Sequence, residues 1–261
     1  MKKIIKWFLS KSLKFKIIFG IVVLLSVSFF IHIQFMKRKG NILDNIRFSA
    51  SYSDKNDQLL QIFLTEDDKY RIFRPLEQYP PEFIEALLMQ EDKFFYTHAG
   101  VNFVALVKAG WETYIKKSRR IGASTITMQV AKLKYNLYTK NIPGKINQII
   151  KAFYLELCFS KDEILEAYLN LAPVGGNVEG FETGAWYYFN KNIRQLNLSE
   201  IIMLCVLPQN PIKRAPTTYG TPSELISARK ILFETWIEKH PEDEDKKIFM
   251  DMQMSVKCSF P

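Results

Sequence analysis

The chain has few cysteines, no internal repeats and no low-complexity tract. Only Cys158, Cys205 and Cys258 occur in 261 residues, too few and too far apart for a disulfide framework or a cysteine-based zinc site. Cys158 and Cys205 stand in apolar helical stretches, where buried and unreactive thiols are expected. One globular domain of ordinary size therefore fits the length of the chain.

Acidic residues are absent from the first 39 positions. The whole chain carries 36 Lys and Arg against 27 Asp and Glu, a formal net charge of +9. Nine of those bases lie in residues 1–39, so the remaining 27 bases balance the 27 acids of residues 40–261. The excess charge belongs to the N-terminus, and the composition gives no support for nucleic acid as a partner.

Residues 17–35, IIFGIVVLLSVSFFIHIQF, form one apolar run. As a helix this run would span about 28 Å, close to the hydrocarbon thickness of a bilayer. We interpret it as a transmembrane helix and not a cleaved signal peptide, because FMKRKG follows it in place of a small-residue cleavage site. Six lysines precede the run and three basic residues follow it, which favours a cytoplasmic N-terminus and an extracytoplasmic domain.

This reading divides the chain into five parts. Residues 1–16 are a basic cytoplasmic segment, 17–35 the transmembrane helix, 36–65 a juxtamembrane stalk, 66–220 a mostly helical domain and 221–261 a helical charged tail. Pro80-Pro81 is expected to start a helix. Residues 160–163, from Ser160 to Glu163, are expected to form a capping box. Ser199 is expected to begin an apolar helix that Pro208 ends. Five side chains mark the apolar face of one more helix: Ile146, Ile149, Ile150, Phe153 and Leu157.

The stretch QEDKFFYTHAG, residues 90–100, puts two acids, two phenylalanines and a histidine after an apolar run. Glu91 can act as a general base if aromatic neighbours bury it and raise its pKa. Asp92 and His98 would then shape its surroundings. The alternative is an ordinary helix C-terminus with a histidine that is satisfied in the core.

Two further stretches carry groups that suit an anion. GASTITMQVAK, residues 122–132, combines glycine and hydroxyl residues with Lys132, as in a mobile loop or helix start that binds anions through N–H and hydroxyl groups. An N-cap and a turn would account for the same residues. In GKINQIIKAFYLE, residues 144–156, four side chains share one helix face: Lys145, Gln148, Ala152 and Glu156. The lysine at the head of that face could neutralise phosphate.

Together these stretches resemble the family 51 glycosyltransferases, which polymerise bacterial cell-wall glycan. The motif E-D-x-x-F-x-x-H-x-G stands at residues 91–100, G-x-S-T-[IL]-T-x-Q at 122–129 and K-x-x-I-L-E-x-Y-L-N at 161–170. The resemblance covers roughly residues 66–220. A further motif of the family lies between the last two and usually reads R-K-x-x-E. Here it departs from the pattern, because Gly144 replaces the arginine and Gln148 replaces the acid. This form is similar to the penicillin-binding protein 1C branch, in which a transpeptidase domain follows.

The resemblance implies a mainly α, lysozyme-like glycosyltransferase domain with one N-terminal transmembrane helix in the cell inner membrane. It implies lipid II and the growing glycan strand as substrates, with transpeptidases and other cell-wall synthesis proteins as further partners. Glu91 is the implied base and Gln148 the implied donor-side catalytic residue. The implied substrate-binding residues are Asp92, Phe95, His98, Ser124, Thr125, Gln129, Lys132 and Lys145. The family leaves room for a divalent cation, Mg²⁺ or Mn²⁺, although the uncharged Gln148 makes metal use less expected here.

Two other functions stay open. A glycan hydrolase would share the lysozyme-like fold, but the lysines and the anchor argue against it. A non-catalytic lipid II-binding or scaffold protein would explain the loss of the acid at Gln148. The lone Ser-x-x-Lys at residues 227–230 lacks the partner motifs of a penicillin-binding site. The aromatic residues of FRPLEQYPPEF (73–83) and AWYYF (185–189) are expected in the core, with the lipid interface as the alternative.

Overall fold

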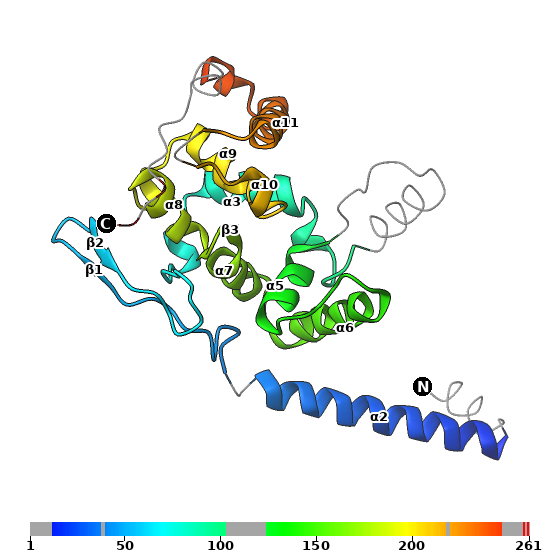
Figure 1. Cartoon of the computed structure of the whole chain (residues 1–261). Coiled ribbons are helices and arrows are strands. Elements are labelled where there is room, and N and C mark those ends of the chain that lie inside the picture. The colour runs from blue at the N-terminus through cyan, green and yellow to red at the C-terminus, as the bar shows by residue number, and fades with distance from the viewer. Residues whose placement is uncertain are drawn as a thin grey trace. The chain divides into compact units, whose positions relative to one another are not determined.

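A computed structural model describes residues 12–37, 40–102, 124–217 and 220–246, together with Cys258 and Phe260. The chain divides into two units, one up to Asn41 and one from Ile42 onward. The first unit contains one long helix, α2, Leu13–Lys37 (Figure 1). By length and composition its part Leu13–His32 suffices to cross a membrane. The predicted transmembrane segment, residues 17–35, lies inside this helix.

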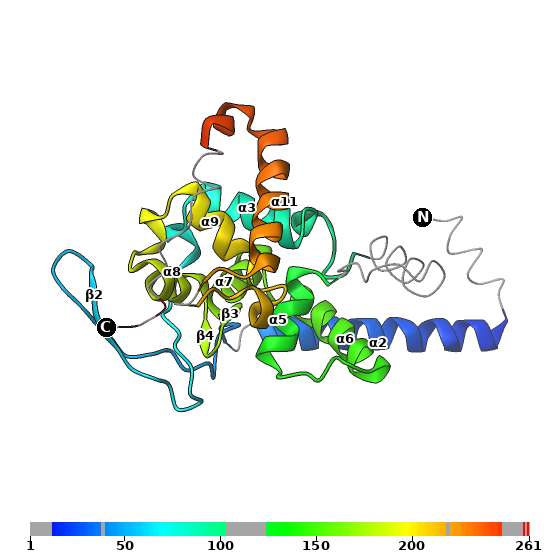
Figure 2. The same cartoon turned by 45° about the horizontal axis from the view of Figure 1, so that its top comes forward.

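The second unit is mainly helical, as predicted, with two short hairpins (Figure 2). Within the described ranges, its α-helices are α3 (Pro81–Glu91), α5 (Ile126–Lys134), α6 (Ile142–Cys158), α7 (Lys161–Leu171), α8 (Phe181–Phe189), α9 (Leu198–Val206), α10 (Pro211–Arg214) and α11 (Ser223–Lys239). Single 3₁₀ turns occupy Leu76–Gln78, Phe95–Thr97 and Ile193–Gln195, and a longer one Pro241–Lys246. The antiparallel hairpins pair β1 (Ser51–Ser53) with β2 (Leu59–Ile62) and β3 (Pro173–Gly175) with β4 (Val178–Glu179).

Local sequence signals explain where the helices begin. Pro81 is the first residue of α3, as predicted. Ser160 caps α7 in the predicted box with Glu163. The predicted start of α9 at Ser199 is wrong, because Asn197 forms the capping box with Glu200 and the helix begins one residue before the serine. The Ser199 hydroxyl instead accepts a hydrogen bond from a guanidinium group on α11.

Helices α7, α8 and α9 each supply at least four side chains to the main core, with α3 packed on α9 and α5 packed on both α6 and α7. Helix α11 also belongs to this core, because its buried side chains lie against α9 and α3. Ile42 and Leu43, from the predicted stalk, are buried in the same cluster. The packed unit therefore extends on both sides of residues 66–220. Of the AWYYF aromatics, Trp186, Tyr188 and Phe189 are buried, in agreement with core packing.

The predicted apolar face of α6 does not pack in the core as a whole. Ile146, Ile150 and Leu157 are exposed, whereas Ile149 and Phe153 are partly buried. The buried side of α6 instead carries Gln148, Ala152, Leu155 and Cys158. The helix thus turns its polar glutamine inward and leaves large apolar side chains facing outward.

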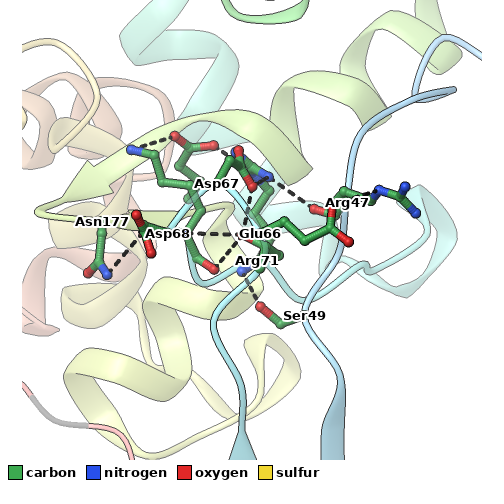
Figure 3. A network of polar contacts seen from close by, with 10 residues as sticks. Arg47, Ser49, Glu66, Asp67, Asp68, Arg71 and Asn177 are labelled. Carbon is green, nitrogen blue, oxygen red and sulfur yellow. Dashed lines mark hydrogen bonds and ion pairs between the residues drawn. The ribbon is translucent and has the colours of Figure 1, made fainter.

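Arg71 joins the segment after α2 to the helical domain. Its Nε donates to Glu179 Oε2 at 2.7 Å, and its Nη2 donates to Asp67 Oδ2 at 2.6 Å. Its Nη1 donates to the Arg47 carbonyl at 3.0 Å (Figure 3). The segments that contain Arg47, Asp67 and Glu179 therefore meet at one buried guanidinium group. This Arg71 side chain holds the pKa of Asp67 down at about 2, because it hydrogen-bonds the ionised carboxylate.

Candidate active site

Glu91 is the last residue of α3, and its carboxylate meets side chains from α5 and α7. Its Oε2 accepts a hydrogen bond from Gln129 Nε2 at 2.6 Å, and the Tyr168 hydroxyl donates to Gln129 Oε1 at 3.4 Å. Its Oε1 is buried and has no hydrogen-bond partner within the described part of the chain. One carboxylate oxygen is therefore fixed by a hydrogen bond, and the other is buried without one.

The surroundings of Glu91 favour its protonated form more than water does. Burial raises the pKa of Glu91 to about 7, against the lowering effects of the Gln129 hydrogen bond, the Arg214 charge and Tyr168. A carboxyl group with this pKa both loses and gains a proton readily near neutral pH, which is the property that a general base needs.

Asp92 and His98 fasten the loop after α3 to the start of α5. His98 Nε2 lies 2.9 Å from both carboxylate oxygens of Asp92, and Asp92 Oδ2 accepts a hydrogen bond from the Ile126 N–H at 3.1 Å. Phe95 is buried beneath the same loop. These three predicted substrate-binding residues hold the Glu91 loop in place, and contact with substrate stays a prediction for each of them.

Lys161 and Glu156 hold the same loop from α6 and α7. Lys161 Nζ donates to the His98 carbonyl and to Glu156 Oε1, each at 2.7 Å. Glu156 Oε1 also accepts from Thr127 Oγ1 at 2.5 Å. Gly100 has a φ of +82°, and a Cβ at this position would lie 2.7 Å from Glu156 Cγ. The close approach and the positive φ together explain the glycine.

Both hydroxyl residues that were expected to bind substrate, Ser124 and Thr125, form hydrogen bonds at the start of α5. Thr125 is the N-cap, since its Oγ1 accepts from the Met128 N–H at 3.1 Å and donates to the Gly100 carbonyl at 2.6 Å. The N-cap alternative is therefore confirmed for Thr125. Ser124 Oγ accepts a hydrogen bond from Lys145 Nζ at 2.7 Å. Gly122, which opens this motif, lies outside the described residues.

Lys145 is held in a fixed position by two neighbours. Besides Ser124, its Nζ donates to Gln148 Oε1 at 2.9 Å, and Gln148 Nε2 donates to the Met128 carbonyl at 2.6 Å. Burial and then the charge of Lys132 lower the pKa of Lys145. Lys132 itself is exposed and lines a cavity of about 680 Å³ that Glu91 does not line. The two ammonium groups lie close enough to interact, which suits an anionic group with more than one charge.

The residues around Gln148 do not suit a divalent cation. Mg²⁺ and Mn²⁺ prefer carboxylate oxygens, whereas Gln148 offers an amide oxygen that already accepts a hydrogen bond from an ammonium group. In the described ranges, His, Cys, Asp and Glu side chains form no group of three that could hold a metal ion. The groups around Gln148 are thus ammonium, hydroxyl and amide groups, which suit an anion better than a cation.

Arg214 and Gln209 belong to the surroundings of Glu91, and neither was predicted from the sequence. Gln209 Nε2 donates to the Gln90 carbonyl at 3.2 Å. Arg214 Nη1 donates to Gln209 Oε1 at 3.2 Å and to the Val206 carbonyl at 2.7 Å. No pattern marks the arginine, which follows a turn in the stretch PQNPIKR. Tyr168 could have been found, because it is the tyrosine of K-x-x-I-L-E-x-Y-L-N.

Known proteins resemble this chain over most of its second unit. The family model described as transglycosylase matches residues 56–236. Penicillin-binding protein 1C of Escherichia coli (strain K12) is 38% identical over 172 residues, 66% of this chain and 22% of that protein. Penicillin-binding protein 4 of Bacillus subtilis (strain 168) is 31% identical over 178 residues, 68% of this chain and 28% of that protein.

A solved structure of penicillin-binding protein 1A from Haemophilus influenzae aligns with 83% of this chain and 22% of its own, at 16% identity and a TM-score of 0.45. The chain thus spans only 22% to 28% of the length of these three relatives.

Proposed function

Because the chain belongs to the transglycosylase family, we propose that it is a peptidoglycan glycosyltransferase. Its substrate would be lipid II, a disaccharide-pentapeptide on undecaprenyl pyrophosphate. The products would be β-1,4 glycan strands and undecaprenyl pyrophosphate. One observation carries the proposal: Glu91 has one oxygen fixed by Gln129, one oxygen free of hydrogen bonds within the described residues, and a pKa of about 7.

In this proposal the growing glycan is the donor. The 4-hydroxyl of the incoming GlcNAc attacks C1 of the donor's MurNAc, and its proton passes to Glu91 Oε1. The new O–C1 bond forms as the bond from C1 to the pyrophosphate oxygen breaks, and the leaving group departs with that electron pair. Attack from the opposite face converts the α linkage to β. The hydrogen bond from Gln129 keeps the carboxylate aimed while it accepts the proton.

The departing pyrophosphate needs positive charge nearby. Lys145 supplies it from a position fixed by Ser124 and Gln148, and Lys132 supplies a second ammonium group. Gln148 serves here as a positioning residue for Lys145 and not as a metal ligand. The chemistry uses no nucleotide, which suits a domain on the outer face of a membrane. We place the N-terminus in the cytoplasm and the second unit outside, anchored by α2 and close to transpeptidases and other cell-wall enzymes.

The proposal is tested with labelled lipid II in detergent, with products separated on a gel. The chain should produce a ladder of polymer, and Glu91→Gln should lower the rate by roughly 10²–10⁴-fold. Glu82→Gln, an exposed acid in the first turn of the same helix, should keep the unmodified rate. A Glu91→Gln variant that retains activity would place the base elsewhere.

Two other results would replace the proposal with its alternatives. Bound but unchanged lipid II would indicate a scaffold protein. Fragments released from purified cell-wall sacculi would indicate a hydrolase.

A further inference from the structure

Tyr168 lies next to the Glu91 site and takes no direct part in the proposed proton transfer. Its side chain is fully buried on α7, and its ring meets the Phe181 ring of α8 edge-on, with 6.1 Å between the ring centroids. Burial, and then the charge of Glu91, raises the pKa of the Tyr168 hydroxyl well above its usual value. The hydroxyl is therefore held in place and keeps its proton near neutral pH.

Gln129 lies between this hydroxyl and Glu91. Its Oε1 accepts from the Tyr168 hydroxyl at 3.4 Å, and its Nε2 donates to Glu91 Oε2 at 2.6 Å. A glutamine amide has one donor end and one acceptor end, and its neighbours decide which end faces which group. Because Tyr168 donates to the oxygen end, the nitrogen end faces the carboxylate, and a hydrogen bond from N–H favours the ionised form of Glu91.

The reversed orientation of the Gln129 amide would favour the opposite state of the base. With its Oε1 turned toward Glu91, the amide would repel an ionised carboxylate and accept a hydrogen bond from a protonated one. The reversal would also take the Gln129 acceptor away from the buried Tyr168 hydroxyl, which costs free energy. A phenylalanine at position 168 would remove that cost and allow the amide to turn.

We propose that Tyr168 is a positioning residue of the polymerisation reaction, which acts through Gln129 to keep the Glu91 carboxylate ready to accept a proton. The inference rests on the proposed function and adds α7 to the helices that set the state of the base. Three other groups face Glu91: Arg214 of α10 lowers its pKa by charge, Asp92 raises it by charge, and Cys205 of α9 is a buried thiol. Burial and then the charge of Glu91 raise the pKa of Cys205, so this thiol stays neutral.

The first experiment compares Tyr168→Phe with the unmodified chain in the lipid II polymerisation assay. The rate at pH 7 should fall roughly 2–10-fold, the range expected for one hydrogen bond. The acidic limb of the pH profile should move to higher pH, and the rate should recover at alkaline pH, where Glu91 is ionised again. Tyr188→Phe is the matched control, because Tyr188 is also buried and its hydroxyl donates to the Val174 carbonyl at 2.8 Å. It should leave the limb in place.

A second experiment measures the ionisation of Glu91 without substrate. Infrared difference spectra between the chain and its Glu91→Gln variant report the protonated carboxyl group of Glu91 as the pH is changed. The pKa of Glu91 should rise in Tyr168→Phe. In Gln129→Leu, which lacks the amide, the further change Tyr168→Phe should leave that pKa where it is, because the connection between the two side chains is already lost. This titration keeps its meaning even if the chain makes no polymer.

A ring-fluorinated tyrosine at position 168 tests the same link if Tyr168→Phe does not fold. Its shape is nearly unchanged and its hydroxyl is a stronger donor, so the acidic limb should move to lower pH. An unmoved limb together with an unmoved Glu91 titration would overturn the proposal. A further rise of the Glu91 pKa in the double variant would overturn it too, since Tyr168 would then act on Glu91 without Gln129.

Discussion

Replacing Arg214 with glutamine would test how the charges around Glu91 set its ionisation. With a pKa of about 7, roughly half of the Glu91 side chains are ionised at pH 7. Arg214 lowers this pKa, and loss of a neighbouring positive charge typically raises the pKa of a carboxyl group by about 1 or more. At a pKa of about 8, only about a tenth of the molecules would carry the ionised base at pH 7, an approximately fivefold loss.

The assay is the initial rate of polymer formation from labelled lipid II, measured from about pH 5.5 to pH 9.5. In Arg214→Gln the acidic limb of the profile should move to higher pH, and the rate should recover at the alkaline end, where Glu91 is ionised again. Arg214→Lys keeps the charge and should keep the limb in place. A loss of the same size at every pH, with an unmoved limb, would refute the reasoning. Arg214 would then act only through its hydrogen bonds to Gln209 and the Val206 carbonyl.

Three further substitutions probe the proposed anion site, the Arg71 cluster and the Glu91 loop. Gln148→Glu puts a carboxylate beside Lys145, so we expect weaker binding of inorganic pyrophosphate by calorimetry. We also expect new Mn²⁺ binding by electron paramagnetic resonance, and equal Mn²⁺ binding before and after the change would contradict this. Arg71→Met should lower the free energy of unfolding in urea by about 1–3 kcal/mol, because it removes the hydrogen bonds of the buried guanidinium to Asp67, Glu179 and the Arg47 carbonyl, while Lys69 still pairs with Glu179 and Asp67 is half exposed. Asp67, with its folded pKa of about 2, contributes stability above its unfolded pKa of about 3.9 and loses it as the pH falls toward 2, so the effect of Arg71→Met should shrink in acid. Gly100→Ala should cost about 1–3 kcal/mol, more than Gly176→Ala, which has a positive φ but no atom within 4 Å of the added Cβ.

Motifs in the sequence predicted which segments form the site better than they predicted what each side chain does there. Glu91 and Gln129 belong to different motifs, and the structure joins them through a hydrogen bond. Lys132 and Lys145 were expected to act together, and the charge of the first does lower the pKa of the second. Asp92 and Thr125 were expected at the substrate; both form hydrogen bonds at the start of α5, and their contact with substrate stays a prediction. A motif identifies the residue types that a site needs without separating contact with substrate from support of the contact.

Other features could not be read from the sequence because they depend on tertiary packing. The periodicity of α6 identified an apolar face, but only the packing of Gln148 toward Met128 shows that the opposite face is the buried one. Arg214 is linked to the surroundings of Glu91 by two hydrogen bonds, from Arg214 to Gln209 and from Gln209 to the Gln90 carbonyl. The spacing of these residues along the chain does not predict that link. Residues 221–239 look like a charged tail by composition, yet Leu232 and Trp236 anchor them in the core.

The first turn of α5 has a consequence for inhibition. Asp92 accepts a hydrogen bond from the Ile126 N–H, and Thr125 donates one to the Gly100 carbonyl. Gln129, the fourth residue of the helix, donates one to Glu91. Ser124, just before the helix, receives the Lys145 ammonium group. The proposed base and the Lys145 ammonium group are therefore both held by residues at the start of α5. A small molecule that displaced this turn would disturb the positions of Glu91 and Lys145 together. It would not need to resemble either the sugar or the pyrophosphate.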